Sequence, residues 1–331
     1  MKILIIGGGV FVGKAIAEAA SGRGHRVTIF NRGKTTTATL PGIEWIKGDR
    51  DGDLSALHAG GWDAVIDTCA YFPRQVRALL GAVGSTIGHY TFISSVSAYA
   101  DISQPGLSES APLAPFPDAA EDKVTGATYG PLKSECEKAA LDSGVGAVLL
   151  VRPGIIAGPW DPTGRFACWL NRVARGGEML VPGGADATLQ LIDVRDLAAW
   201  IIPMVETRSA GAFNTVGAGP FTWGDMLAAC SAATRSTPTF TWVSDAFIAE
   251  QGVTDWTSLP FYLFRDRRSI AGLFQVDGSA ALRTGLVHRP FAETTADTYR
   301  WLREGAPKEP ILGLAPEREK ELLAAWHARK A

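Results

Sequence analysis

The chain has 331 residues, 46% of them hydrophobic, and a formal net charge of −2 at pH 7. That hydrophobic share is enough for a sizeable core in one large or two modest domains. The charge balance and the lack of a basic run argue against nucleic acid and anionic membranes as main partners, and favour a small-molecule substrate.

The four cysteines, Cys69, Cys136, Cys168 and Cys230, are far apart and have no histidine at ligand spacing. They predict neither a metal site nor a disulfide framework, which fits a reducing, cytoplasmic location. The apolar run after Met1 is too short for a signal peptide and breaks into glycines. No other stretch reaches transmembrane length.

The first half of the chain alternates short β-branched runs with helical patterns. Strands are predicted at Ile3–Ile6, Val27–Phe30, Ile43–Ile46, Ala64–Ile66, Thr91–Ile93 and Ala147–Val151. Helices are predicted at Phe11–Ser21, Arg74–Val83 and Tyr129–Ser143. This alternation is typical of βαβ units. The expected fold class is therefore α/β, a Rossmann-type doubly wound parallel sheet with a smaller C-terminal substrate-binding region.

After about Gly154 the pattern becomes irregular and is punctuated by prolines and glycines. Two further strands are predicted at Leu189–Val194 and Ala212–Val216, and three helices at Asp225–Thr234, Pro290–Arg303 and Pro316–Arg329. We expect a dinucleotide-binding domain over residues 1–154, with late core elements from about 187–217. Residues 155–331 are expected to form mainly the substrate-binding region and the C-terminal helices.

A glycine-rich turn directly follows the first predicted strand. A strand, a glycine turn and a helix in this order bring backbone amides and a helix N-terminus to a pyrophosphate. The predicted cofactor contacts in this turn are Gly7, Gly9, Val10, Phe11, Val12 and Gly13.

The second predicted strand is followed by Asn31, Arg32 and Lys34. An NAD enzyme usually has an acidic residue at this place, which binds the ribose hydroxyls. A guanidinium at this position can bind a 2′-phosphate through charge-assisted hydrogen bonds. NADP(H) is therefore favoured over NAD(H) as the cofactor. The alternative is that Arg32 is a solvated loop residue.

Two further segments at strand ends are predicted to contact the cofactor. Asp49, followed by Arg50, comes after the third strand and can accept a hydrogen bond from the adenine amino group; alternatively it is a turn residue. Thr68, Cys69 and Ala70 follow the fourth strand, where small side chains let the dinucleotide approach.

Tyr129 and Lys133 are four residues apart, which puts both side chains on one face of a helix. An ammonium near a phenol lowers the phenol pKa from its usual value of about 10. Tyr129 is thereby predicted to act as an acid or base near neutral pH. The same pattern occurs on solvated surface helices. The serines Ser94 and Ser95, at the end of the preceding strand, favour the catalytic interpretation, because parallel strands deliver ligand-facing residues there.

With Arg152-Pro153-Gly154 and Ile192-Asp193-Val194-Arg195-Asp196 added, these motifs resemble the short-chain dehydrogenase/reductase superfamily. The resemblance is to its extended or atypical branch, the NAD-dependent epimerase/dehydratase family. It implies that Ser95 polarises a substrate oxygen, with Ser94 or Ser97 as the alternative if the register is shifted. It also implies that Tyr129 transfers a proton, and that Lys133 binds the nicotinamide ribose and lowers the tyrosine pKa. It also places Ser94, Pro153, Gly154 and Ile155 in the cofactor site.

The sequence departs from the family pattern at positions that bear on the substrate. Nucleotide-sugar epimerases of the family typically carry an asparagine at the position of Ile155 and an arginine near Leu189 and Gln190. Two contacts expected for a nucleotide diphosphate are therefore missing. The glycine turn and Asn31-Arg32-Gly33 also resemble atypical members related to plastid stem-loop-binding proteins.

The resemblance implies an NAD(P)-dependent oxidoreductase that transfers hydride between NADPH and a small-molecule carbonyl or alcohol. One alternative is a redox-neutral epimerase or dehydratase acting on a sugar or nucleotide sugar. Another is a non-catalytic relative that binds the cofactor or RNA. Formation of a homodimer through helices flanking the sheet is a further expectation from the family.

Overall fold

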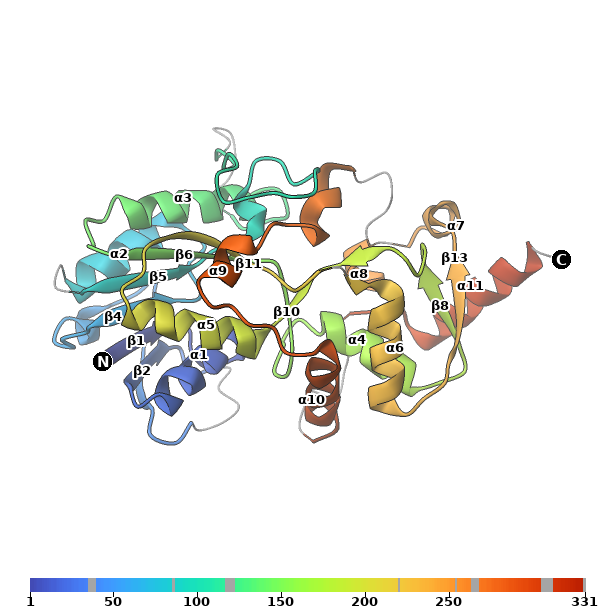
Figure 1. Ribbon diagram of the computed structural model, residues 1–331, viewed down its shortest axis with the longest axis horizontal. Helices are drawn as coiled ribbons and strands as arrows, with labels where there is room; N and C mark the ends of the chain where they lie inside the picture. Colours follow the sequence, from blue (N-terminus) through green and yellow to red (C-terminus); the bar gives the residue numbers. More distant parts are fainter. Residues whose placement is uncertain are drawn as a thin grey trace.

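The computed structural model describes residues 1–34, 40–84, 87–116, 123–219, 221–253, 255–262, 268–304 and 312–329. The molecule is elongated, with the N-terminus and a large sheet at one end and the C-terminal elements at the other (Figure 1). Within the described ranges no helix is both long enough and apolar enough to cross a membrane.

A seven-stranded parallel sheet forms the larger half, in the order β11-β6-β5-β4-β1-β2-β3. Its strands are β1 (Lys2–Ile6), β2 (Arg26–Asn31), β3 (Glu44–Lys47), β4 (Ala64–Asp67), β5 (His89–Ile93), β6 (Val148–Pro153) and β11 (Gly211–Thr215). Each strand predicted in the first half overlaps one of these. The predicted Rossmann-type fold is thus confirmed.

Helices cover both faces of this sheet. They are α1 (Phe11–Gly22), α2 (Pro73–Val83), α3 (Tyr129–Leu141) and α5 (Val194–Glu206). Ile3 and Ile5 of β1 belong to the core shared with α1 and α5, whereas Leu4 and Ile6 belong to the core shared with α2 and α3. Because alternate residues of a strand point to opposite faces, a strand buried on both faces must be apolar throughout. The run Ile-Leu-Ile-Ile meets this requirement.

The single strand predicted at Leu189–Val194 is wrong. The chain forms β9 (Thr188–Leu189) and β10 (Leu191–Asp193), and α5 begins at Val194. Asp193 ends the extended segment because its carboxylate accepts a hydrogen bond from the Arg195 amide and caps α5. The sequence analysis did not predict α5, which contains Pro203 in its interior, a residue that usually argues against a helix.

The remaining elements form a second, smaller half with its own apolar core. Its strand pairs are β7 (Ile155–Ala157) with β10, β9 with β12 (Phe221–Thr222), and β8 (Glu178–Pro182) with β13 (Thr239–Val243). Its helices are α4 (Arg165–Ala174), α6 (Trp223–Thr234), α7 (Asp245–Glu250), α8 (Asp255–Ser258), α10 (Phe291–Glu304) and α11 (Pro316–Ala328). The short helix α9 (Ser279–Arg283) packs on β11 of the sheet half. The three helices predicted in this half overlap α6, α10 and α11. The predicted domain boundary near residue 154 stays a prediction, and β11 and α5 return to complete the sheet half.

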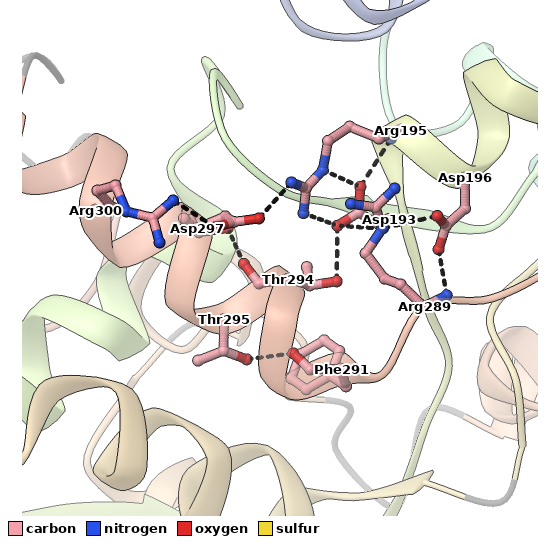
Figure 2. Close-up of polar contacts among 10 residues, drawn as sticks. Asp193, Arg195, Asp196, Arg289, Phe291, Thr294, Thr295, Asp297 and Arg300 are labelled. Carbon is pink, nitrogen blue, oxygen red and sulfur yellow. Dashed lines mark hydrogen bonds and ion pairs between the residues drawn. The ribbon is translucent and has the colours of Figure 1, made fainter.

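A buried carboxylate joins the two halves (Figure 2). Asp193 is 4% exposed and accepts hydrogen bonds from the Arg195 guanidinium, at 2.8 and 3.0 Å, and from the Thr294 hydroxyl of α10, at 2.7 Å. Arg195 also pairs with Asp297 on α10. Arg289, which precedes α10, pairs with Asp196 on α5 at 2.7 Å. The start of α5 and the start of α10 are therefore held together by alternating charges.

Replacement of Asp193 by Asn should destabilise the protein by about 2–3 kcal/mol, because it leaves partly buried arginine charge without its partner. Asp297→Asn is the matched control. Its carboxylate is 25% exposed, and loss of such a partly solvated pair should cost about 1 kcal/mol or less. Urea unfolding of both variants measures the difference, and equal losses would contradict the role assigned to Asp193.

Candidate active site

The predicted glycine turn lies between β1 and α1. The Gly7 amide donates to the Phe30 carbonyl at 3.0 Å, and Gly7 has a φ of +101°. A Cβ added at Gly7 would lie 2.4 Å from the Thr68 hydroxyl oxygen, so only glycine fits here. Val10 precedes α1 without a side-chain cap, which leaves the first amides of the helix open to a ligand. Both features suit a pyrophosphate.

Seven of the predicted cofactor residues line one cavity beside this turn. They are Gly7, Asn31, Arg32, Lys34, Asp49, Arg50 and Cys69. Asn31 and Asp49 also shape the local backbone, since their side chains accept hydrogen bonds from the amides of Gly33 and Asp51. Asp49 is thus a turn residue, as the alternative interpretation predicted, and it also lines the cavity.

Arg50 forms a two-pronged ion pair with Asp67, the last residue of β4, at 2.7 and 2.9 Å. Asp67 is fully buried and also accepts a hydrogen bond from the Tyr90 hydroxyl at 3.2 Å. Burial alone would raise the pKa of Asp67, but the charge of Arg50 outweighs it and holds that pKa below its usual value. The guanidinium of Arg50 is therefore engaged by Asp67 within the protein. The sequence analysis missed Asp67, although an acid ending a parallel strand was a visible signal.

A close approach between two backbones brings Tyr129 to Ser95. Ser95 caps the short 3₁₀ helix η2 (Val96–Ala98), and its hydroxyl accepts from the Ser97 amide at 3.1 Å. A Cβ added at Gly130 would lie only 2.0 Å from the Ser97 carbonyl oxygen. Glycine at this position therefore lets the first turn of α3 rest directly on η2, beside Ser95.

Burial raises the pKa of Tyr129, and a hydrogen bond with Ser95 and the positive charge of Arg165 act in the opposite direction. The predicted lowering of this pKa by Lys133 is therefore not what the structure shows. The Lys133 Nζ lies 6.0 Å from the Tyr129 ring centroid and is directed towards other groups. Desolvation of the phenol, which a helical spacing cannot reveal, is the larger effect.

The Lys133 ammonium is 3% exposed and donates to the carbonyl oxygens of Ala70 and Ile93, both at 2.9 Å. The rings of Phe92 and Tyr71 lie 4.8 and 5.0 Å from Nζ, within the range of cation–π attraction. Burial lowers the pKa of Lys133. Because an ammonium has three donors, one N–H is left for a ligand.

Two residues that the sequence analysis did not select lie at this site. The Tyr71 ring is 6.2 Å from the Tyr129 ring, centroid to centroid, and its side chain is among the exposed ones at 40%. Tyr71 directly follows the predicted Thr68–Ala70 segment, so extending that segment by one residue would have found it. Arg165, at the start of α4, lies in the irregular part of the sequence and gave no signal.

The other predicted residues border the same region. The Ser94 hydroxyl is buried and has no hydrogen-bond partner within the described ranges, so a bound group can satisfy it. Pro153 ends β6, and the Gly154 amide donates to the Thr215 carbonyl at 3.3 Å. Ile155 begins β7 and packs against two apolar clusters, so its side chain offers a ligand apolar contact and no hydrogen bond.

These residues fit a dinucleotide with respect to shape and polar groups. The turn leaves room for a backbone approach, the cavity holds Arg32 and Lys34, and both the Ser94 hydroxyl and one Lys133 N–H lack partners of their own. In the described parts of the chain, no cluster of histidine, cysteine and acidic side chains is suited to a metal ion.

Comparison with known proteins finds one matching family model and several similar proteins. Residues 74–217 match the NAD dependent epimerase/dehydratase family, a span that contains Ser95, Tyr129 and Lys133. The chain is 30% identical over 252 residues to the chloroplast stem-loop binding protein of 41 kDa b from Arabidopsis thaliana, covering 70% of this chain and 63% of that protein. It is 23% identical over 236 residues to the 2′-dehydrokanamycin reductase of Streptomyces kanamyceticus, covering 68% of this chain and 64% of the relative. The chain thus spans slightly less than two thirds of each of these relatives.

A solved structure agrees with the fold. The UDP-glucuronic acid 4-epimerase from Bacillus cereus, in complex with NAD, superposes with a TM-score of 0.67 and covers 92% of this chain and 99% of that chain. The two sequences are 14% identical, so this similarity shows the fold alone.

Substitution of Gly7 by Ala should weaken NADPH binding at least tenfold, or about 1.4 kcal/mol. The added methyl would meet Thr68 at 2.4 Å, and the backbone φ of +101° is one that alanine rarely adopts. Gly22→Ala is the control, because a Cβ there meets nothing within 4 Å. Fluorescence titration with NADPH reports the affinity, and wild-type binding by Gly7→Ala would refute this placement of the cofactor.

Proposed function

We propose that the chain, which matches the NAD dependent epimerase/dehydratase family over residues 74–217, is a nicotinamide-dependent oxidoreductase. It transfers hydride between NADP(H) and the carbonyl or carbinol carbon of a small molecule. The observation that carries this proposal is that Ser95, Tyr129 and Lys133 lie together beside the glycine turn and its cavity.

The proposed roles follow from the contacts of each side chain. Ser95 and Tyr129 hold the substrate oxygen by hydrogen bonds, and Tyr129 exchanges the proton. Lys133 fixes the cofactor ribose with its remaining N–H. A bound nicotinamide supplies or accepts the hydride. Because burial raises the pKa of Tyr129, the phenol is protonated near neutral pH and is suited to donate a proton to a carbonyl being reduced.

The relatives support the reductive direction. One protein that matches over most of this chain is named a reductase of 2′-dehydrokanamycin. A shorter match of 66 residues, 42% identical, is to a 2-alkyl-3-oxoalkanoate reductase from Stenotrophomonas maltophilia. Both names describe reduction of a carbonyl group.

A redox-neutral epimerase or dehydratase is the second candidate, because the family description names these activities. Enzymes of this kind that act on nucleotide sugars typically carry an arginine near Leu189 and Gln190, and the surroundings of these two residues do not suit a diphosphate. Leu189 is fully buried in the core of the C-terminal half. The Gln190 amide is used internally, donating to the carbonyls of Gly217 and Val276 at 3.2 and 3.0 Å. Neither residue offers a cation to a diphosphate.

The chloroplast relative is named for stem-loop binding, which keeps an RNA-associated function as a third candidate. A net charge of −2 disfavours it, because affinity for nucleic acid depends on neutralising phosphates. Salt-sensitive RNA binding at submicromolar affinity would support it. A cytoplasmic location and a homodimer stay predictions.

Tyr129→Phe should reduce turnover with NADPH and a carbonyl substrate at least a hundredfold, because the proton donor is lost. Its NADPH affinity should remain close to wild type. A panel of aldehydes and ketones, followed through NADPH absorbance, supplies the substrate. Tyr299→Phe on α10 is the control. Full turnover by Tyr129→Phe would refute the reductase mechanism, and a nucleotide that copurifies at one per chain and resists dialysis would favour the redox-neutral enzyme.

Arg32 is proposed to bind the 2′-phosphate of NADP(H), with Lys34 beside it in the same cavity. The protein should therefore bind NADPH at least tenfold more tightly than NADH, and Arg32→Ser should remove that preference by weakening NADPH alone. Arg77→Ser, on the exposed side of α2, is the control. Tighter binding of NADH by the wild-type protein would count against the assignment.

A further inference from the structure

Arg165 occupies a fixed position at the start of α4. The preceding turn is built by Asp161, whose carboxylate accepts from the Thr163 amide at 2.9 Å and from the Thr163 hydroxyl at 2.7 Å. Gly164 then adopts a φ of +67°, and the Arg165 amide donates to the Thr163 hydroxyl at 3.4 Å. The backbone that carries the Arg165 side chain is therefore held by several contacts.

The guanidinium of Arg165 is half-buried but has no ion pair and no hydrogen bond to any residue in the described ranges. Among the residues that the structure describes, other half-buried arginines form ion pairs, as Arg172 does with Glu319 and Arg289 with Asp196. The charge of Arg165 acts on Asp161, but the carboxylate oxygens of Asp161 accept hydrogen bonds from Thr163. A partly desolvated and unpaired cation is costly to a protein, and a ligand anion relieves that cost.

The neighbours of Arg165 place it at the active site. Its guanidinium carbon lies 5.7 Å from the Trp256 ring centroid. Trp256 in turn packs against the apolar cluster that contains Val96, the residue that follows Ser95. The charge of Arg165 also acts on the Tyr129 phenol. A cation that contacts Trp256 and whose charge acts on the Tyr129 phenol borders the space in which a substrate must lie.

We propose that Arg165 determines substrate specificity by binding a carboxylate of the substrate while Ser95 and Tyr129 hold the oxygen that reacts. The substrate class is thus an oxo acid, reduced to the corresponding hydroxy acid. This inference rests on the proposed function and deepens it. The carbonyl carbon of the acid gains a hydride from NADPH, its oxygen takes the Tyr129 proton, and the products are the hydroxy acid and NADP⁺.

A carboxylate fits this guanidinium better than other anions do. The planar fork of arginine matches the two oxygens of a carboxylate, and contact with an aromatic ring restricts the plane of the fork. A single arginine neutralises one negative charge, as a carboxylate requires, whereas a phosphate dianion needs further cations. The charge of Arg165 also lowers the pKa of the Tyr129 phenol, against the effect of burial.

The test compares each anion with a neutral twin. Pyruvate, acetoacetate and levulinate are titrated by calorimetry into the protein with and without saturating NADP⁺, beside their methyl esters. Dihydroxyacetone phosphate and dihydroxyacetone form the phosphate arm. NADP⁺ prevents turnover, so the measurement reports binding alone. The proteins are wild type, Arg165→Gln, Arg165→Lys, and the surface control Arg300→Gln, whose side chain is 62% exposed on α10.

At least one oxo acid should bind the wild-type protein tenfold more tightly than its ester. Arg165→Gln should abolish that advantage without weakening the ester, Arg165→Lys should retain part of it, and Arg300→Gln should retain all of it. The proposal is overturned if no acid exceeds its ester, if the advantage survives in Arg165→Gln, or if only the phosphate arm depends on Arg165.

A failure of the proposed function gives a different result. If the oxo acids bind through Arg165 but NADP⁺ does not bind, or if no carbonyl compound is ever reduced, the carboxylate site stands and the oxidoreductase assignment falls. Conversely, reduction of neutral carbonyl compounds with equal kcat/KM by wild type and Arg165→Gln, together with no advantage for any acid, leaves the reductase and removes the carboxylate site.

Discussion

The buried ammonium of Lys133 is the group around which the site is arranged. A charge that is 3% exposed must be compensated by its surroundings, and here two backbone carbonyls and two aromatic rings do so. One carbonyl, of Ile93, ends β5, the other, of Ala70, lies in the loop after the neighbouring strand β4, and the ammonium comes from α3. The requirements of one cation therefore hold together the three segments that present Tyr71, Ser95 and Tyr129.

The position of the second half relative to this site depends on another set of charges. Asp193 caps α5 and also binds Arg195 and Thr294, so the sheet half and α10 share one buried carboxylate. Helix α10 packs on α4 and α6, and α4 carries Arg165. This chain of contacts links the parallel sheet to Arg165, whose charge acts on the Tyr129 phenol. The cofactor end and the substrate end of the site are thus set by different parts of the fold.

The sequence was sufficient to predict the parallel sheet, because strands buried on both faces read as short apolar runs between helical patterns. It also selected Ser95, Tyr129 and Lys133, which lie together in the structure, although their catalytic roles stay predictions. The pKa of Tyr129 was expected to fall and is raised, because burial is a tertiary property that spacing along a helix cannot report. The contact of Arg165 with Trp256 and the ion pair of Arg50 with Asp67 join segments that are separated in the sequence. A local sequence pattern could not predict them.

A crystal structure of the protein with NADP⁺ bound tests the account most directly. The account predicts the pyrophosphate over the Gly7–Gly13 turn, the 2′-phosphate beside Arg32, and the Lys133 Nζ within about 3.2 Å of a nicotinamide-ribose hydroxyl. The nicotinamide ring should lie between Ser94 and Tyr129. A nicotinamide bound away from Tyr129, with Lys133 making no contact to the cofactor, would contradict it.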